Sequence, residues 1–181
     1  MRVIAGIAGG IRLETPSGRD VRPTRDSVRE SLFNILMPRI AGARFLDLFA
    51  GTGANGIEAL SRGADFCTFV EEDPRIAGLI RRNLKKARLA EKAEVIRRPL
   101  PAALGKLGNK GVPYDIVFAD PPYEGIDYGL VFQALRESCL AAPESIVILE
   151  HRARAPIPEE LCGYHRTRLN IYGETGLSFF A

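Results

Sequence analysis

Polar and apolar residues alternate in two different ways along the chain, and the change falls near residue 44. Before it, residues 2–16 contain two short extended segments, VIAGIAG and IRLETP, which we expect to fold back on each other at Gly9-Gly10. From Thr24 to about Met37 the apolar residues recur every three or four positions, which predicts a helix capped by Thr24 and ended by Pro38. The chain is therefore expected to begin with a small β-hairpin and a helix.

After residue 44, short apolar segments alternate with helical patterns. The apolar segments FLDLF, FCTFV, DIVFA and SIVIL lack a strict alternation with polar residues, which is typical of strands covered on both faces of a sheet. The expected strands lie near residues 44–48, 66–71, 93–97, 114–119 and 145–150, and the expected helices near 54–62, 74–89, 100–107 and 127–140. This order predicts an α/β fold with a mostly parallel, doubly wound sheet. Two extended stretches within residues 164–180 predict an antiparallel C-terminal hairpin at one sheet edge.

Length and composition agree with one compact unit. The 181 residues are 46% apolar and 26% charged, which suffices for one substantial core and excludes a disordered chain. No apolar run approaches the roughly twenty residues that a membrane span requires. No linker divides the chain, so we expect an N-terminal extension over residues 1–42 attached directly to an α/β domain over residues 43–181.

Cysteine and histidine usage gives no sign of a disulfide framework or a metal centre. The three cysteines, Cys67, Cys139 and Cys162, are odd in number and lack C-x-x-C spacing, so they are interpreted as reduced core thiols of a cytoplasmic protein. The two histidines, His151 and His165, are too few and too far apart in the chain for a histidine-built metal site. The first residues lack a signal-peptide cleavage site.

Positive charge is concentrated at the N-terminal end. The net charge is only +3, but residues 1–44 contain eight arginines, no lysine and four acidic residues. Arginine without lysine suits planar contacts with phosphates and bases, although a solvated basic edge explains the charge equally well. This end of the chain is therefore a candidate nucleic-acid surface.

A glycine-rich turn follows the first strand of the α/β domain. In FLDLFAGTGANGIEAL, Gly51, Gly53 and Gly56 match G-x-G-x-x-G between a strand and a helix, where glycine lets the backbone approach a ligand. Glu71 lies 20 residues after Gly51, at the end of the second strand, where a carboxylate can accept both ribose hydroxyl hydrogen bonds. Glu72 is the competing residue, but Glu71 directly follows the last apolar residue of the strand. The pattern predicts a site for an adenosine-type cofactor.

Asp47 helps to choose between cofactors. A dinucleotide needs the helix N-terminus for its pyrophosphate, whereas S-adenosylmethionine carries a sulfonium and an amino group and no phosphate. A carboxylate just inside the turn attracts a cation and repels a pyrophosphate, so Asp47 favours S-adenosylmethionine. The alternative role of Asp47 is structural, as a cap for backbone N–H groups of the turn.

The tetrapeptide Asp120-Pro121-Pro122-Tyr123 follows the fourth strand, which in a doubly wound sheet lies beside the first. Two prolines remove two N–H donors, so the turn presents hydrogen-bond acceptors and one aromatic ring. The exocyclic amine of a nucleobase is a poor nucleophile, because its lone pair is delocalised into the ring. The Asp120 carboxylate and the Pro121 carbonyl can hold such an amine while Tyr123 stacks on the base, so catalysis would rest on positioning and electrostatics.

These motifs together resemble one family over essentially the whole chain. DPPY with LDLFAGTGA looks like the amino-methyltransferases that use S-adenosylmethionine. With RVIAG at 2–6, RPT at 22–24, RESLFNIL at 29–36 and YGETGLSFF at 172–180, the chain resembles the bacterial 16S rRNA guanine-N2 methyltransferases. The resemblance implies a Rossmann-like class I methyltransferase fold and methylation of guanine(966) of 16S rRNA within a small-subunit particle. It also implies a cytoplasmic enzyme, expected to be a monomer without metal or membrane partner.

The resemblance and the charge pattern together assign further residues. The expected cofactor-binding residues are Asp47, Ala50, Gly51, Gly53, Glu71 and Arg98, and the expected RNA contacts are Arg2, Arg12, Arg22, Thr24, Arg25 and Arg29. The chain departs from the family pattern at Ala8-Gly9-Gly10, where a basic or aromatic residue is usual. It departs again after the third strand, where Arg97-Arg98 replaces an acid and backbone groups near Arg98 are expected to hold the adenine.

Three other functions remain open at this point. The nearest is methylation of adenine N6 in DNA or RNA through the same turn, although such enzymes often carry an insertion for which this chain has little room. An NAD-dependent oxidoreductase would need a proton-relay residue, which the sequence does not place. A noncatalytic RNA-binding protein of the same fold predicts RNA affinity without methyl transfer.

Overall fold

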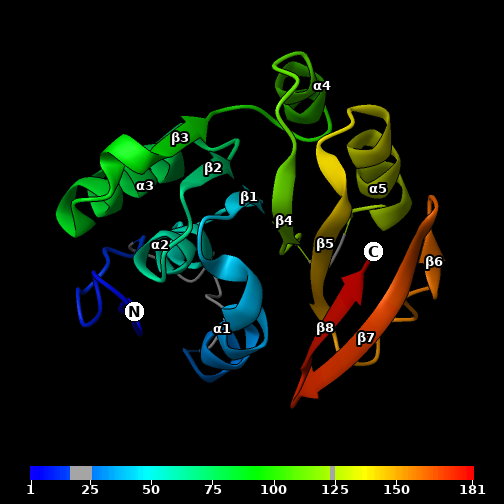
Figure 1. Ribbon diagram of the computed structural model, residues 1–181, viewed down its shortest axis with the longest axis horizontal. Coiled ribbons are helices and arrows are strands. Elements are labelled where there is room, and N and C mark those ends of the chain that lie inside the picture. The colour runs from blue at the N-terminus through cyan, green and yellow to red at the C-terminus, as the bar shows by residue number, and fades with distance from the viewer. Residues whose placement is uncertain (17–25, 123–124) are drawn as a thin grey trace.

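The computed structural model describes residues 1–16, 26–122 and 125–181. Its described part contains one eight-stranded sheet with the strand order β3-β2-β1-β4-β5-β8-β7-β6 (Figure 1). The strands are β1 (Arg44–Leu48), β2 (Phe66–Val70), β3 (Ala93–Ile96), β4 (Tyr114–Ala119), β5 (Ala141–Arg152), β6 (Glu160–Leu161), β7 (Tyr164–Tyr172) and β8 (Thr175–Phe180). The first five are parallel and β6–β8 are antiparallel, which confirms the predicted α/β fold.

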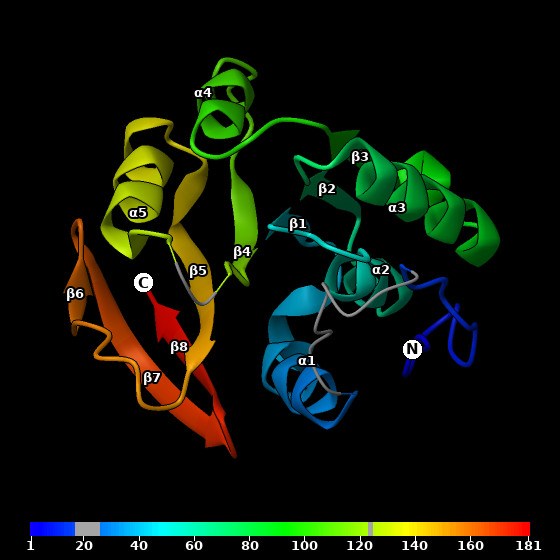
Figure 2. The ribbon, with the colours of Figure 1, turned by 180° about the vertical axis from the view of Figure 1, so that it is seen from behind.

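Helices cover both faces of the sheet, as its uninterrupted apolar strands predict (Figures 1 and 2). The helices are α1 (Asp26–Ile40), α2 (Ala54–Ser61), α3 (Pro74–Ala87), the 3-10 turn η1 (Ala90–Lys92), α4 (Ala102–Gly108) and α5 (Tyr128–Glu137). Two apolar clusters form the core. One holds buried side chains of α1, α2 and α3, and the other holds those of α4 and α5, such as Leu104 and Phe132.

Helix α1 differs from the sequence-based prediction at its end. The helix was expected to stop before Pro38, but it continues through this residue to Ile40. Pro38 has no N–H, so the helix lacks one backbone hydrogen bond, the one to the Asn34 carbonyl. Ile40 is 1% exposed and packs in the core, which favours the extra residues.

The N-terminal segment folds back on itself and docks onto α2. Arg2 and Arg12 form an antiparallel bridge, in agreement with the predicted hairpin. Buried Glu58 of α2 accepts hydrogen bonds from the Ile4 and Ala5 N–H groups at 2.7 and 3.0 Å. Gly6 has a φ of +82°, and a Cβ there would collide with the backbone of Ser61 in the same helix. The segment is thus held by side chains of the α/β domain.

The C-terminal hairpin extends the sheet beyond β5. The expected pairing around Tyr172-Gly173 is confirmed, with β8 between β5 and β7. Phe179 and Phe180 are buried as expected. The expectation of three core thiols was wrong for two of them: Cys67 is buried under α2, but Cys139 and Cys162 are exposed in turns. None of the helices in the described ranges is long and apolar enough to cross a membrane.

Candidate active site

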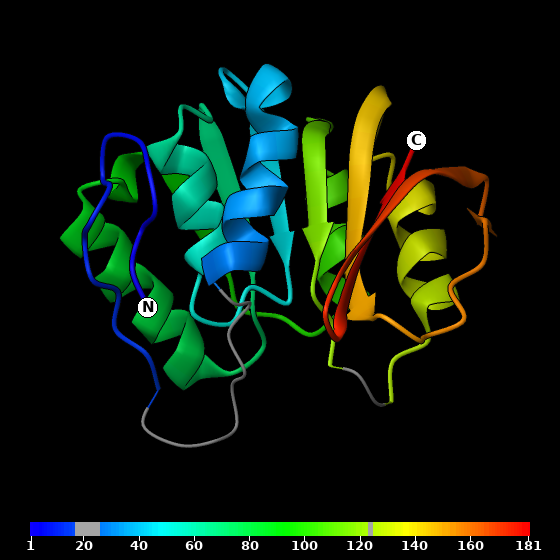
Figure 3. The ribbon, with the colours of Figure 1, turned by 90° about the horizontal axis from the view of Figure 1, so that it is seen from below.

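The glycine turn and the Asp-Pro-Pro turn lie side by side at one edge of the sheet. Strands β1 and β4 are parallel neighbours, and Leu48 at the end of β1 is in register with Ala119 at the end of β4. The Asp120 N–H donates to the Leu48 carbonyl at 3.4 Å. Figure 3 shows these two strands ending on the same side of the molecule. Pro121 is buried, Pro122 is exposed, and Tyr123 lies outside the described residues.

The glycine turn adopts backbone conformations that favour glycine. Phe49, Gly51 and Gly53 have φ values of +59°, +52° and +77°. Gly53 precedes α2, and Gly56 lies in its first turn, where a Cβ would collide with the Phe69 ring and the Cys67 sulfur. Gly56 therefore allows α2 to pack closely on β2, while Gly51 and Gly53 shape the turn.

The Glu71 carboxylate lies against the glycine turn. Its Oε2 accepts the Gly51 N–H at 3.0 Å, and its Oε1 accepts the Asp73 N–H at 2.9 Å. Burial raises the pKa of this half-buried carboxyl group, while the two hydrogen bonds oppose the shift. Each carboxylate oxygen retains a further lone pair for a ligand hydroxyl. Because Glu72 is exposed, this geometry favours Glu71 as the ribose ligand.

Asp47 lies beneath the turn. It is 1% exposed, and its Oδ2 accepts the Gly56 N–H at 2.9 Å. Burial raises the pKa of Asp47 to about 8; the Gly56 hydrogen bond opposes this shift and the charge of Glu71 adds to it. The cap of a backbone N–H, left open by the sequence, is therefore present, and a direct contact between Asp47 and the cofactor stays a prediction.

The remaining cofactor candidates lie near this edge. The Ala50 N–H donates to the Val70 carbonyl at 3.0 Å, which joins the glycine turn to the end of β2. Strand β3 is the neighbour of β2 on the side away from β1. It ends at the same edge of the sheet, where the Glu71 N–H donates to the Ile96 carbonyl at 3.1 Å. Arg98 follows that strand end and is exposed. Contacts of Ala50 and Arg98 with a cofactor stay predictions.

Two residues at the site, Tyr128 and Asn83, belong to no recognisable sequence motif. Tyr128 at the start of α5 is half-buried; burial and the nearby charge of Asp120 raise its pKa, and Arg152 opposes them. Asn83 of α3 is fully buried and donates through Nδ2 to the Thr52 carbonyl in the glycine turn at 3.1 Å. Asn83 also exchanges two hydrogen bonds with the backbone of Glu14, at 2.7 and 3.0 Å. Only its place on the buried face of an amphipathic helix could have signalled this role.

Replacing Asn83 by alanine should destabilise the protein, because it leaves the buried Thr52 carbonyl and two partly buried backbone groups of Glu14 without their partner. We expect a loss of about 1–3 kcal/mol in the free energy of unfolding, measured by urea denaturation. Asn109→Ala, at an exposed residue after α4, is the matched control and should change stability by less than about 0.5 kcal/mol. Equal stability of the two variants would show that the Asn83 hydrogen bonds contribute nothing.

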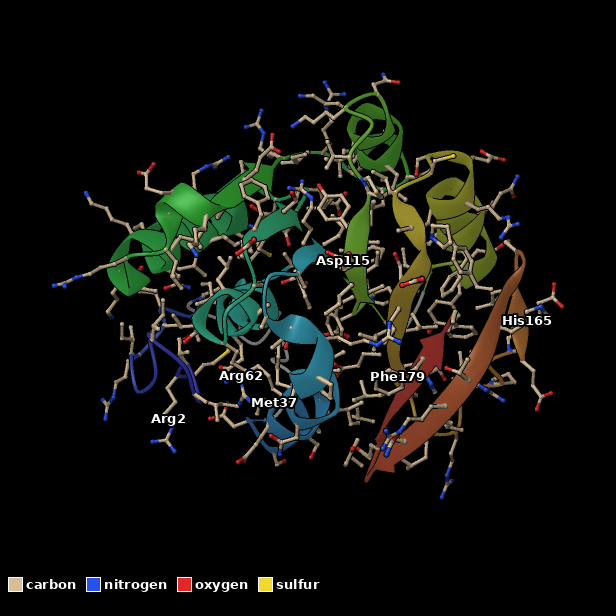
Figure 4. The ribbon with its side chains drawn as sticks, in the orientation of Figure 1. Arg2, Met37, Arg62, Asp115, His165 and Phe179 are labelled. Carbon is tan, nitrogen blue, oxygen red and sulfur yellow. The ribbon has the colours of Figure 1, made fainter. Side chains whose placement is uncertain are left out.

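The structure separates the six RNA-contact candidates. Arg2 and Arg12 are exposed on the N-terminal hairpin, and Figure 4 shows Arg2 at the periphery of the molecule. The prediction for Arg29 was wrong, because the residue is 0% exposed and its side chain donates to the Arg2 carbonyl at 2.6 Å and to Asp26 at 3.0 Å. Burial lowers the pKa of Arg29, and the charges of Asp26 and Glu58 oppose this. The other three, Arg22, Thr24 and Arg25, lie outside the described residues.

Comparison with known proteins places the chain in a family. The model of the family described as Conserved hypothetical protein 95 matches residues 1–181. A putative rRNA methyltransferase of Bacillus subtilis is 36% identical, covering 99% of this chain and 98% of its own. Ribosomal RNA small subunit methyltransferase D of Escherichia coli is 33% identical, covering 99% and 89%. The chain belongs to this family.

Solved structures agree with this assignment. A putative methyltransferase from Escherichia coli has a TM-score of 0.88 at 31% identity, covering 99% of this chain and 96% of its own. Two more distant neighbours share the fold: a putative S-adenosylmethionine-dependent methyltransferase from Streptococcus mutans at 18% identity, and a putative methyltransferase complexed with S-adenosylhomocysteine at 16%. These findings confirm the predicted family and fold class, and S-adenosylmethionine stays the expected cofactor. The residues of the site also fit this cofactor, because a carboxylate faces the turn at the end of β2.

Proposed function

We propose that this protein transfers a methyl group from S-adenosylmethionine to the exocyclic N2 of a guanine in 16S rRNA, at guanine(966). The observation that carries this proposal is the adjacency of the Asp120 turn and the glycine turn at the ends of β4 and β1. A nucleobase amine held at the first turn lies next to a cofactor bound at the second. Membership of the family, over the whole chain, supports rRNA as the substrate.

Each turn has a separate task. Glu71, the glycine turn from Ala50 to Gly53, and backbone groups near Arg98 hold the cofactor, which supplies an electrophilic methyl group. The Asp120 carboxylate and the Pro121 carbonyl accept hydrogen bonds from the amine and favour a lone pair directed out of the base plane. Tyr123 stacks on the base, and Pro122 stiffens the turn. A paired base could not reach this turn, so the target nucleotide is looped or flipped out.

The N-terminal extension, residues 1–42, binds RNA in this proposal. Arg2 and Arg12 are exposed on one hairpin, and Arg22, Thr24 and Arg25 follow it in the chain. Arginine side chains bind phosphates through planar, bidentate hydrogen bonds. The substrate is a small-subunit particle in the bacterial cytoplasm, and the protein acts on it as a monomer.

Labelled methyl transfer tests the proposed reaction. Small ribosomal subunits from cells lacking the endogenous activity are incubated with the protein and labelled S-adenosylmethionine, and the product nucleoside is identified by mass. We expect N2-methylguanosine from 16S rRNA. N6-methyladenosine would replace the proposal with the adenine alternative, and RNA binding without any product would favour a noncatalytic protein.

Replacing Arg22 and Arg25 by glutamine should flatten the salt dependence of RNA binding. Each lost phosphate contact should lower the slope of log K against log salt by about 0.7–0.9. The Lys85→Gln/Lys92→Gln double variant removes the same charge from an exposed region of α3 and η1 and should leave the slope unchanged. Filter binding over a range of salt concentrations measures both slopes. A lower slope in the lysine variant alone would instead place the RNA-binding surface on α3.

A further inference from the structure

A second carboxylic acid, Glu150, lies beside Asp120 at the end of the neighbouring strand. Strands β4 and β5 are parallel, and Ala119 is in register with Leu149. The residues that follow this pair are Asp120 and Glu150, so their backbones are separated by about one inter-strand spacing, roughly 4.8 Å. Glu150 is only 3% exposed. It belongs to the longer strand, because β5 continues to Arg152 while β4 ends at Ala119.

The alternation of side chains places both acids toward the same face of the sheet. Phe118 and Ile148, two residues before Asp120 and Glu150, pack in the cluster that contains α1 and α2. Leu177, the cross-strand partner of Glu150 on β8, belongs to the same cluster. Side chains of paired residues lie on one face of a sheet. The two carboxyl groups are therefore expected on the α1 side of the site.

Two adjacent carboxylates match the donor groups of guanine. The Watson–Crick edge of guanine carries the N1–H donor directly beside the N2 amine. Adenine presents an acceptor at N1, which a carboxylate repels. We propose that Glu150 accepts the N1–H of the target guanine while Asp120 and the Pro121 carbonyl hold N2, so that Glu150 selects guanine over adenine. This assignment rests on the proposed function and names its specificity residue.

The same contact assists the reaction. The N2 lone pair forms the new bond to the methyl carbon, and the electron pair of the broken sulfur–carbon bond stays on sulfur. Positive charge develops on N2 as this bond forms, next to N1, and is removed when one N2 proton leaves to Asp120 or to water. A carboxylate at N1–H stabilises this charge more strongly in a buried site than in water.

A matched pair of bases tests Glu150 without changing the amine. Small subunits are reconstituted from 16S rRNA with guanine or 2,6-diaminopurine at the target position; diaminopurine keeps the N2 amine but has an acceptor at N1. The wild-type protein should prefer guanine by about 10²-fold in kcat/KM, because the analogue leaves the carboxylate facing an acceptor. In Glu150→Gln the side-chain amide can donate to that acceptor, so the preference should fall by about 10-fold or more.

Controls separate this assignment from the proposed function. Glu144→Gln, at an exposed glutamate of the same strand, should retain the wild-type preference, and binding of S-adenosylhomocysteine should be equal in all three proteins. An unchanged preference in Glu150→Gln would overturn the role of Glu150 while N2 methylation stands. Equal rates of the wild-type protein on guanine and diaminopurine would also overturn the role of Glu150, and this result does not depend on whether the variant folds. Absence of N2 methylation on either base would instead overturn the proposed function.

Discussion

Asp120→Ala should lower the single-turnover rate of methyl transfer by about 10²-fold or more, in line with removal of one preorganised group that stabilises a transition state. The backbone N–H of Asp120 donates to the Leu48 carbonyl at the end of β1. This hydrogen bond positions the backbone of Asp120 beside the glycine turn. Alanine lacks the carboxylate. In the wild-type protein this carboxylate holds the amine as a hydrogen-bond acceptor and stabilises the positive charge that develops on its nitrogen. Rapid-quench measurement with saturating cofactor isolates this step.

Two further variants show whether the loss at Asp120 is electrostatic. Asp120→Asn keeps an oxygen acceptor but no charge, so its rate should lie between those of the wild-type protein and Asp120→Ala. Asp127→Ala removes another acid from the same connection, where Asp127 accepts the Gly129 N–H at 2.8 Å as the N-cap of α5. Its rate should stay near the wild-type value, since it costs a cap and no catalytic group. A near-normal rate in Asp120→Ala would remove Asp120 from the transition state.

The sequence predicts those parts of the molecule that depend on local pattern. Five parallel strands, their connecting helices and the C-terminal hairpin follow from apolar segments and turn residues near one another in the chain. The glycine turn and Glu71 are also predictable, because the order of strands in a doubly wound sheet fixes which strand ends are neighbours. The adjacency of Asp120 and Gly51 follows from this topology, although 69 residues separate them.

The parts that the sequence could not predict depend on long-range contacts. Arg29 looked like a surface arginine because its helix carries an apolar stripe on one side. It is buried because the N-terminal hairpin covers it and supplies the Arg2 carbonyl, while Glu58 of α2 lies 3.9 Å from its guanidinium. Asn83 likewise depends on two segments, around Thr52 and Glu14, that meet only in the folded chain. Such polar residues cannot be assigned until their distant partners are known.

Glu71→Ala should weaken binding of S-adenosylhomocysteine by about 1.5–3 kcal/mol, the range for hydrogen bonds to a charged group. This corresponds to roughly 10- to 150-fold in the dissociation constant. The loss has two sources. The ribose hydroxyls lose their acceptor, and the Gly51 N–H loses the carboxylate that holds the glycine turn in place. Titration calorimetry at a temperature where the variant is folded measures the change.

The neighbouring Glu72 provides the matched control for Glu71. Glu72→Ala removes the same charge one residue further along, but from an exposed side chain, so screening by solvent should leave affinity within about 0.5 kcal/mol of the wild-type value. A loss confined to Glu71→Ala places the ribose at the end of β2, because a general effect of negative charge would appear in both variants. Unchanged affinity in Glu71→Ala would remove Glu71 from the cofactor site. Its bonds to Gly51 and Asp73 would then serve only to join the glycine turn to the start of α3.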